Sequence, residues 1–336
     1  MLADIVEHLR CPVCREGVRL DAGAVRCGHG HAFDVARQGY VSLLTGSQAP
    51  GTADSSAMVA ARADFLGRGH YAPLARALAE TAAACLAPAT PSRNAGAGRE
   101  SAGPADATAL DPNHGAGRES AGPAGTTALD PYAAGGPGAG APVIVDAGAG
   151  TGYYLGAVLD AVPRATGIAF DISKHAVKRA ARAHERAGAF VADAWRPLPL
   201  GDAVADVVMN VFAPRNGTEF ARILRPGGHL IVVIPAGDHL SPLVRELGLL
   251  SVDEAKEHRV AESLRGFEET GRREVRFEMS LTREDVGLAV GMGPSAWHKD
   301  PDHLHHQIRK FPEWTSAIAS FRLSIFTAPP QSRPIP

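Results

Sequence analysis

Short apolar runs alternate with longer stretches of helical spacing along the chain after residue 142. The runs predict strands over residues 143–147, 165–171, 188–192, 205–211 and 229–234. Each stretch between two runs is long enough for a helix. This alternation predicts a mostly parallel sheet that is covered by helices on both faces and connected by right-handed crossovers. We therefore expect an α/β fold.

Residues 55–86 precede the predicted sheet and carry apolar side chains near helical spacing. Gly67, Gly69 and Pro73 interrupt the spacing, because glycine and proline disfavour helix interiors. The pattern predicts two helices that are joined by a turn near Tyr71.

A long segment between these helices and the sheet has almost no large apolar side chains. Residues 88–140 contain two leucines and one tyrosine among alanine, glycine, proline, serine and threonine, and GAGRESAGPA begins at Gly96 and again at Gly115. Such a segment buries too little apolar surface to offset its ordering entropy. We expect a flexible linker without chemistry.

Composition adds limits on function. The 336 residues are 45% hydrophobic, enough for a substantial core, and 34 basic against 36 acidic side chains give a net charge of −2. That balance provides no whole-molecule argument for binding nucleic acid or membranes, so RNA contacts would need local patches. The basic segment 174–186 is expected to be a helix with a solvated outer face. The opening MLADIVEHLR lacks the basic start and apolar run of a signal peptide, so a soluble, cytoplasmic protein is expected.

Three of the four cysteines lie within the first 27 residues, which favours a metal site over disulfides in a reducing compartment. Cys11, Cys14, Cys27 and His31 form the pattern C-x2-C-x12-C-x3-H. Two such pairs, brought together by a hairpin, complete a tetrahedral zinc site. The remaining Cys85 is expected to be buried in a helix.

His29 is a rival for the fourth metal ligand, because GHGH offers two imidazoles two residues apart. We favour His31, since its spacing from Cys27 leaves room for a turn. Reduced, unligated cysteines are the alternative. A site with four protein ligands is closed, so zinc would be structural and would stabilise a module of low apolar content.

A glycine-rich turn follows the first predicted strand and opens a helix. Gly148, Gly150 and Gly152 let the backbone turn tightly and approach a ligand, and the helix start supplies free amide donors. A dinucleotide-binding dehydrogenase would show a similar turn. The turn alone therefore predicts nucleotide-type binding without naming the ligand.

Acidic residues at the ends of three predicted strands favour S-adenosylmethionine (SAM). Asp146 can lie near the methionine ammonium, Asp171 near the ribose hydroxyls and Asp193 near the adenine amino group. Asp171 would serve an NAD enzyme equally well. The segment FARILRPGGHLIVVIP, however, is common in class I methyltransferases and unusual in dehydrogenases. We therefore favour SAM over NAD.

Together the cysteine pattern, HAFDVARQGYVSLL, GHYAPL, DAGAGTGYY and LRPGGHLIVVIPAGDHL resemble the RlmA/TlrB family of 23S rRNA guanine-N1 methyltransferases. The resemblance covers nearly the whole chain except the repeated linker, and is greatest to the macrolide-resistance subgroup. It implies a class I, Rossmann-like SAM-dependent methyltransferase with a small N-terminal zinc ribbon. It further implies methylation in the hairpin 35 loop, at nucleotide 748 or 745, and a homodimer.

The resemblance also implies residue roles. Zinc would be held by Cys11, Cys14, Cys27 and His31, and SAM would be contacted by Tyr71, Tyr154, Leu155 and His239. The expected domains are a zinc-binding domain (1–45), a helical connector (46–87), the linker (88–140) and a methyltransferase domain with a C-terminal substrate or lid segment (141–336).

Transfer of a methyl group to guanine N1 requires loss of the N1 proton. Asn210, at the end of the fourth predicted strand, can position the guanine, although a strand-end cap is the alternative. His239 or Asp193 could take the proton, but each has a competing role toward SAM, so no base is assigned. Candidates for stacking on the guanine, each also explicable by core packing, are Tyr153, Tyr154, Phe212 and Trp297.

Two other functions remain open from the residues. A small-molecule methyltransferase of a macrolide pathway would share the SAM turn but has no clear need for a zinc knuckle. A non-catalytic RNA-binding module would not need the intact turn or its acids.

Overall fold

The computed structural model describes residues 1–46, 53–87, 140–249, 260–293 and 300–329. One compact unit comprises Met1–Leu86 and Gly140–Pro336. The predicted linker and Trp297 lie outside the described residues. Within the described ranges, no helix is both long and apolar enough to span a membrane.

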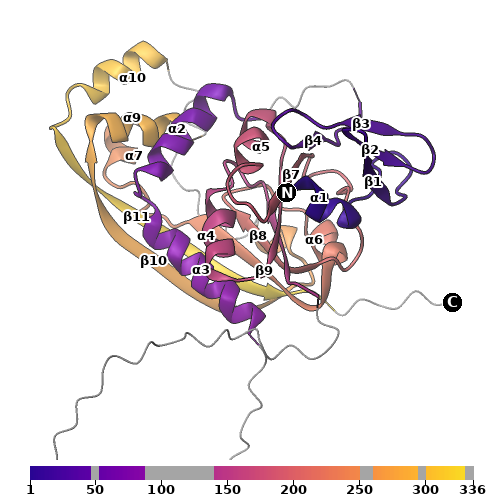
Figure 1. The fold of residues 1–336 in the computed structure, drawn as a ribbon. Helices are drawn as coiled ribbons and strands as arrows, with labels where there is room; N and C mark the ends of the chain where they lie inside the picture. The colour runs from indigo at the N-terminus through magenta and orange to yellow at the C-terminus, as the bar shows by residue number, and fades with distance from the viewer. Residues whose placement is uncertain (47–52, 88–139, 250–259, 294–299, 330–336) are drawn as a thin grey trace, which may run out of the picture. The chain divides into compact units, whose positions relative to one another are not determined.

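Among the described residues, eight strands form one sheet in the order β10-β11-β9-β8-β5-β6-β7-β4 (Figure 1). Its parallel part confirms the predicted α/β fold and consists of β4 (Val41–Ser42), β5 (Val143–Ala147), β6 (Thr166–Asp171), β7 (Ala187–Val191), β8 (Ala205–Val211) and β9 (Leu224–Pro235). The fifth predicted strand is longer than expected and begins at Leu224, because Leu224 already pairs with Ala205 of β8 and the Arg-Pro-Gly-Gly segment forms an irregularity before pairing resumes at His229. Three other predicted boundaries shift by at most one residue.

Helices connect the parallel strands: α4 (Tyr153–Ala161), α5 (Lys174–Ala180) and α6 (Gly217–Ile223). Helix α5 is shorter than the predicted 174–186. The chain leaves the helix after Ala181, and the guanidinium of Arg186 donates to the carbonyls of Val162 and Ala165 beyond α4. Arg186 therefore caps a neighbouring helix instead of extending its own.

The N-terminal segment contains α1 (Leu2–Ile5), a 3-10 turn (Val6–His8) and an antiparallel ribbon of β1 (Val18–Asp21), β2 (Ala24–Cys27) and β3 (Ala32–Asp34). Its apolar side chains join the core of the main sheet: Leu9 and Val25 share one cluster with Phe170 and Phe190. A Cβ at Gly188 of β7 would lie 2.6 Å from Ile5, so α1 packs directly on the strand. Whether the predicted domains fold separately stays a prediction.

The two predicted helices before the linker are present as α2 (Ser56–Gly67) and α3 (Ala72–Leu86). Ser55 caps α2 by accepting from the Met58 amide at 3.2 Å. Gly69 takes a φ of +81° in the turn between the helices, which glycine adopts without strain. Cys85 lies in α3 as expected but is only half-buried, and burial raises the pKa of its thiol to about 11.

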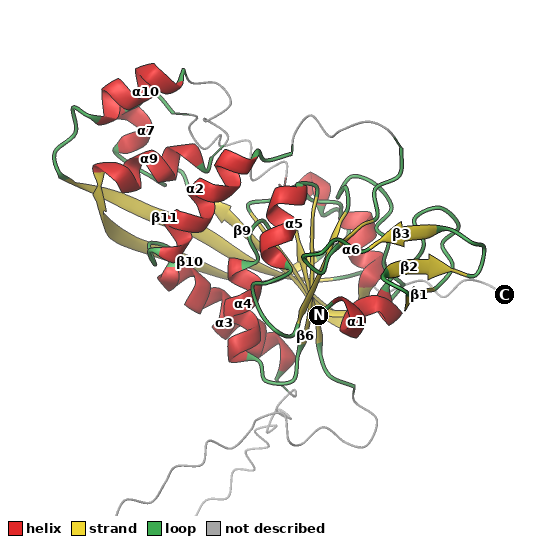
Figure 2. Cartoon of the chain, turned by 45° about the horizontal axis from the view of Figure 1, so that its top comes forward, coloured by secondary structure: helices red, strands yellow, loops and turns green. Residues whose placement is uncertain are grey.

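A long antiparallel hairpin extends the sheet beyond β9 and was not predicted (Figure 2). It consists of β10 (Glu268–Thr282) and β11 (Trp314–Thr327), and the chain between and before these strands forms α7 (Leu243–Glu246), α9 (Arg283–Gly291) and α10 (Pro301–Ile308). Most of β10 is exposed, and most of its exposed residues are charged, which hides its strand character in the sequence.

Candidate functional site

The glycine-rich turn leaves β5 at the edge of the sheet where the parallel strands end. Gly148, Gly150 and Gly152 all have positive φ values, of +76°, +55° and +79°. A Cβ at Gly148 would lie 2.4 Å from the Ala213 side chain, and one at Gly152 would lie 2.7 Å from that of Ala183. The turn therefore needs glycine for its conformation and for close packing, and it leads directly into α4.

Asp171, at the end of β6, holds this turn. Its carboxylate accepts from the amide of Gly150 at 2.9 Å and from that of Ser173 at 2.8 Å. Burial raises the pKa of Asp171, while these two amides partly offset the shift. The residue thus orders the loop, a role that sequence reasoning did not supply, and its contact with ribose hydroxyls stays a prediction.

Asp146 is the most unusual polar group of the site. It is 1% exposed, and neither of its carboxylate oxygens has a hydrogen-bond partner among the described residues. Burial, together with the nearby charge of Asp171, raises the pKa of Asp146 to about 7. A buried carboxylate without a partner is costly, so this group is suited to a cationic ligand such as the methionine ammonium of SAM.

An aromatic cluster lies around Tyr71 and His239. The Tyr71 hydroxyl is 3.2 Å from His239 Nε2, and His239 Nδ1 accepts from the Ser320 amide at 3.3 Å. Phe321 of β11 contacts both rings, with centroids 5.0 Å from Tyr71 and 4.7 Å from His239. The structure thus brings together two of the predicted SAM contacts from distant parts of the chain.

Two further predicted contacts lie in the first turn of α4. The hydroxyl of Tyr154 is buried and has no partner among the described residues, so it has hydrogen-bonding capacity for a ligand. Leu155 is fully buried, and a Cβ at Gly167 of β6 would lie 3.2 Å from its side chain. Leu155 therefore packs on the sheet, and only its backbone is suited to contacting SAM.

Arg62 of α2 is a site residue that sequence reasoning missed. A Cβ at Gly150 would lie 3.5 Å from its guanidinium, which pairs with Asp54 and donates to the Met292 carbonyl at 2.9 Å. Helix α2 is therefore anchored beside the glycine-rich turn. A lone arginine on a helix carries no signal in the sequence that could have found it.

Asp193 and Trp195 follow β7 at the same edge of the sheet. Asp193 Oδ1 accepts from the Trp195 amide at 2.9 Å, and the Asp193 side chain is 22% exposed. The Trp195 side chain is 67% exposed, and sequence reasoning did not single it out. An indole ring that is so exposed next to a predicted adenine contact offers a surface on which a nucleobase could stack.

Asn210, predicted to position the substrate, is fully buried at the end of β8. Its amide nitrogen donates to the carbonyl of Ala147 at 3.2 Å and to that of Pro214 at 2.8 Å. It thereby joins the ends of β5 and β8, as the strand-end alternative anticipated. Its oxygen has no partner among the described residues.

Among the stacking candidates, Phe212 is the most accessible described ring, with 42% exposure. It has a φ of +56°, an unfavourable conformation for a non-glycine residue and one that is concentrated at functional sites. Tyr154, by contrast, is buried, and Tyr153 is partly buried. The strained and exposed ring at the end of β8 is thus the best placed of these candidates.

The ribbon brings Cys11, Cys14, Cys27 and His31 together, with ligand atoms within 4.8 Å of one another. Cys14 Sγ lies 3.7 Å from Cys27 Sγ, and His31 Nδ1 lies 3.6 Å from Cys11 Sγ and 3.3 Å from Cys27 Sγ. A tetrahedral zinc site has edges of about 3.8 Å between sulfurs and about 3.6 Å between sulfur and nitrogen. The donor set and spacing fit zinc, and the exposed His29 is not part of the group.

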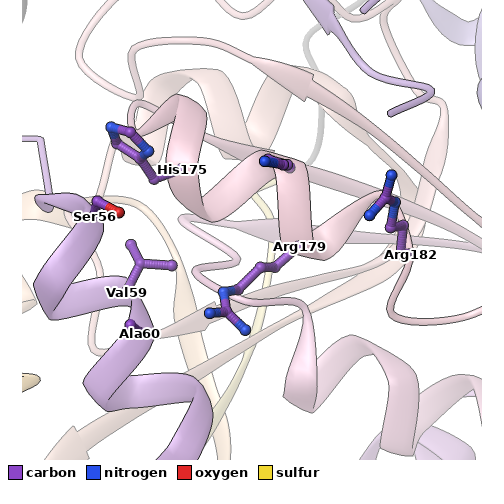
Figure 3. Close-up of a pocket in the computed structure, with 7 residues that line it drawn as sticks. Ser56, Val59, Ala60, His175, Arg179 and Arg182 are labelled. Carbon is purple, nitrogen blue, oxygen red and sulfur yellow. The ribbon is translucent and has the colours of Figure 1, made fainter. Parts of the chain in front are cut away.

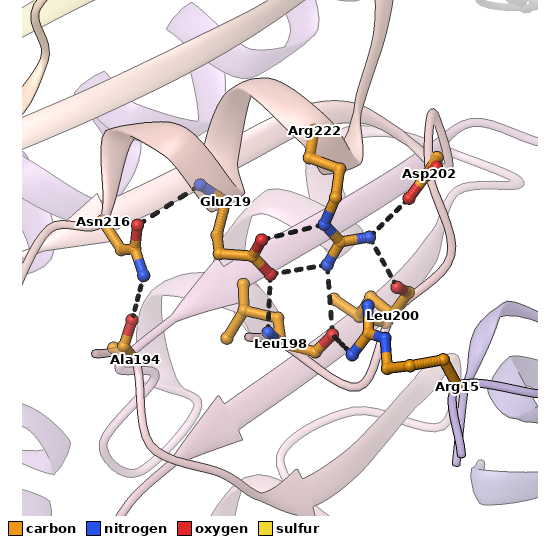
Figure 4. Close-up of polar contacts among 8 residues, drawn as sticks. All are labelled: Arg15, Ala194, Leu198, Leu200, Asp202, Asn216, Glu219 and Arg222. Atoms are coloured by element: carbon orange, nitrogen blue, oxygen red, sulfur yellow. Dashed lines mark hydrogen bonds and ion pairs between the residues drawn. The ribbon is translucent and has the colours of Figure 1, made fainter. Parts of the chain in front are cut away.

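The ribbon contacts the loop that follows Asp193 (Figure 4). Arg15, next to Cys14, donates to the Leu198 carbonyl at 2.8 Å. Arg222 of α6 donates to the same carbonyl at 3.1 Å, and Glu219 accepts from the Leu198 amide at 2.6 Å. Burial would raise the pKa of Glu219, but Arg222 and the Leu198 amide lower it overall. The metal-binding turn and α6 thus hold this loop from two sides.

Comparison with known proteins identifies relatives of this chain. Residues 9–48 match the model of the N-terminal region of RlmA, and residues 144–228 match a methyltransferase domain. A Micromonospora griseorubida protein named for 23S rRNA (guanine-N1)-methyltransferase activity is 48% identical over 96% of this chain and 98% of its own length.

The chain belongs to the 23S rRNA (guanine-N1)-methyltransferase family. Another member, the 23S rRNA (guanine(748)-N(1))-methyltransferase of Streptomyces fradiae, is 43% identical over 93% of this chain and 94% of its own length. A Bacillus subtilis member is 26% identical over 88% of this chain. As a member of this methyltransferase family, the chain combines a SAM-dependent methyltransferase fold with a zinc ribbon whose three cysteines and one histidine can hold one zinc ion.

Proposed function

We propose that the protein transfers the methyl group of SAM to N1 of guanine 748, or of the neighbouring guanine 745, in the hairpin 35 loop of 23S rRNA. The observation that carries this proposal is the likeness, over 94% of its length, to the S. fradiae enzyme whose name specifies guanine 748. The same likeness favours RNA over a small macrolide as substrate.

Asp146 is proposed to bind the SAM ammonium, because its buried carboxylate has no other partner among the described residues. The turn at Gly148, Gly150 and Gly152 would bring backbone amides close to the ligand. Asp171 would accept from the ribose with the lone pairs that Gly150 and Ser173 leave free. The remaining proposed contacts are Tyr71, Tyr154, Leu155, Asp193 and His239.

When bound, SAM supplies an electrophilic methyl group on its sulfonium. The protein's own residues must hold guanine N1 in line with that group, so that the carbon–nitrogen bond forms as the sulfur–carbon bond breaks. We assign stacking on the guanine to Phe212. The free oxygen of Asn210 is proposed to accept from the guanine edge, a positioning role that does not remove the proton.

The N1 proton must leave during transfer, and His239 is poorly suited to take it. Its Nδ1 already accepts from Ser320, and its Nε2 faces Tyr71. This arrangement favours a neutral imidazole that orients the Tyr71 hydroxyl. We therefore assign His239 to the wall of the SAM site and not to proton transfer.

The test is transfer of tritiated methyl from SAM to a transcript of the hairpin 33–35 region, with the modified nucleotide mapped by primer extension. We expect label on the RNA and one stop at guanine 748 or 745. A transcript with adenine at that nucleotide is the matched control and should accept no label. Label on a macrolide but never on RNA would overturn the proposal.

Three finer features follow from the same proposal. Because the proposed substrate is ribosomal RNA, we also propose a cytoplasmic location. The family resemblance favours a homodimer, which sedimentation would test. It also favours a role in macrolide resistance, for which expression in a sensitive host should raise the inhibitory concentration of the drug.

A further inference from the structure

A groove of about 450 Å³ lies between helices α2 and α5 (Figure 3). Its lining consists of Ser56, Val59, Ala60, His175, Lys178, Arg179 and Arg182. In Figure 3, Arg179 extends from α5 toward α2, and Arg182 lies beyond the end of α5. One wall of the groove is thus the first turn of α2, and the other is basic.

The basic wall is a regular stripe. His175, Lys178 and Arg179 are spaced i, i+3 and i+4, so they share one side of α5, and Arg182 follows in the turn after the helix. The opposite side is buried through Ala176, Val177 and Ala180. Residues 174–184 contain no acidic side chain, although the whole chain is slightly acidic.

Neighbouring acids do not neutralise the stripe. None of its four cationic or titratable side chains forms an ion pair with a described residue. The nearby Asp54 pairs with Arg62 instead, and its carbonyl accepts from Ser173 Oγ at 2.8 Å. A solvated outer face, as expected from the sequence, would more often carry both signs of charge.

The groove starts next to the β5 site, by which we mean Asp146, the glycine-rich turn, Asp171, Tyr71, Tyr154 and His239. Helix α5 begins directly after Asp171 and Ser173, and α2 carries Arg62 beside Gly150. SAM has no phosphate group, so the cofactor does not require a basic groove here. An anionic polymer bound in the groove would therefore lie next to Asp171 and Gly150.

We propose that this groove binds the phosphodiester backbone of the rRNA strand that carries the target guanine. The proposal rests on the proposed function for its substrate. Lys178, Arg179 and Arg182 supply the charge, and the first-turn amides of the twelve-residue α2 add the positive end of a helix dipole. Backbone contacts of this kind position RNA without reading its sequence.

The test compares Lys178→Gln/Arg179→Gln/Arg182→Gln with the wild type in binding the hairpin 33–35 transcript over a range of salt concentrations. Removing one cation that neutralises a phosphate should reduce the slope of log Kd against log salt by roughly 0.7, so the slope for the triple variant should fall by about 2. Its affinity should fall at least about tenfold near physiological salt. SAM binding, measured by calorimetry, should not change.

The matched control replaces three exposed arginines outside the groove, Arg76, Arg164 and Arg265, by glutamine. A second control, Lys178→Arg/Arg179→Lys/Arg182→Lys, keeps the charge and should keep the binding. Equal salt slopes for the triple variant and the arginine control would overturn the proposal, as would loss of SAM binding in the triple variant. If the wild type binds the transcript without methylating it, the proposed function fails, and the comparison of slopes still decides the role of the groove.

Discussion

All four side chains of the ribbon's metal group lie within residues 11–31, whereas the β5 site combines Tyr71, Asp146 and His239 from three distant segments. In the metal group, two short turns place the ligands, and their spacing in the sequence already specifies the geometry. In the β5 site, the position of each side chain depends on how the sheet, α2 and β11 pack. A local site can thus be predicted residue by residue, while a site assembled by tertiary structure is predicted only in part.

The two regions also differ in what keeps their polar groups stable. The sulfurs and imidazole of the metal group are spaced for a shared cation. Asp146 instead has no hydrogen-bond partner among the described residues, and burial raises the pKa of its carboxyl to about 7. We therefore propose that the metal group serves the fold, and that the β5 site keeps an unfavourable group in place for a ligand. Arg15 joins the ribbon to the loop after Asp193 through its hydrogen bond to the Leu198 carbonyl.

The largest expected effect is loss of the metal group. Cys14→Ser should abolish stoichiometric zinc and unfold the ribbon, because zinc binding supplies of order 10 kcal/mol to such modules. Since Leu9 and Val25 share a core with the main sheet, the melting temperature of the whole unit should fall too. Zinc analysis and thermal unfolding measure both effects. His29→Ala is the control. Equal zinc content in both variants would contradict the assignment of Cys14, and not His29, as a zinc ligand.

Asp146→Asn should produce the next largest effect, in binding rather than folding. Loss of a buried charge partner should weaken SAM binding by about 3 kcal/mol, or roughly 100-fold, in calorimetry. The ligand-free variant should unfold at a higher temperature than the wild type at pH 8, because it no longer buries an unpartnered charge. Asp160→Asn, at an exposed acid on α4, is the control. Unchanged SAM affinity in Asp146→Asn would remove the proposed ammonium contact.

The pH dependence of SAM binding tests the proposed contact between Asp146 and the SAM ammonium. Burial raises the pKa of Asp146 from 3.8 to about 7 in the folded protein, so folding favours the protonated carboxyl. The resulting contribution to the free energy of unfolding is present below about pH 4 and is lost as the pH rises to about 7. The proposed ammonium contact requires the charged Asp146 carboxylate. The Kd for SAM should therefore increase as the pH falls below 7, by up to about tenfold for each pH unit. Calorimetry should also detect proton release on binding at pH 6. Asp146→Asn should lack both effects, and a flat wild-type profile would contradict the raised pKa.

The smallest effect should come from the contact between the ribbon and the loop after Asp193. Arg15→Ala removes one hydrogen bond from an exposed side chain and should lower the free energy of unfolding by about 1 kcal/mol. SAM affinity should change less than threefold, because Glu219 and Arg222 still hold Leu198. Denaturant unfolding measures the change, with Arg19→Ala of β1 as the control. A destabilisation as large as that of Cys14→Ser would show that the regions are not separable.

The elements that could be predicted from the sequence each have a strong local sequence pattern. The buried strands β5 and β8 follow directly from their apolar runs, and the metal ligands follow from cysteine spacing. Strand β10 escaped prediction because its largely exposed residues are charged. Arg62 escaped because its contact with Gly150 joins segments that are far apart in the chain. The groove beside α5 was not anticipated, since the sequence does not show that α2 lies opposite.

The most direct test of the proposed function measures 1-methylguanosine in 23S rRNA from a host that lacks its own guanine-N1 methyltransferase for this loop. The host would express either the wild-type protein or Asp146→Asn, each confirmed to carry zinc. We expect methylation at one guanine, 748 or 745, with the wild type and a strong reduction with the variant. Absence of 1-methylguanosine with a zinc-loaded, SAM-binding wild type would contradict the proposed function.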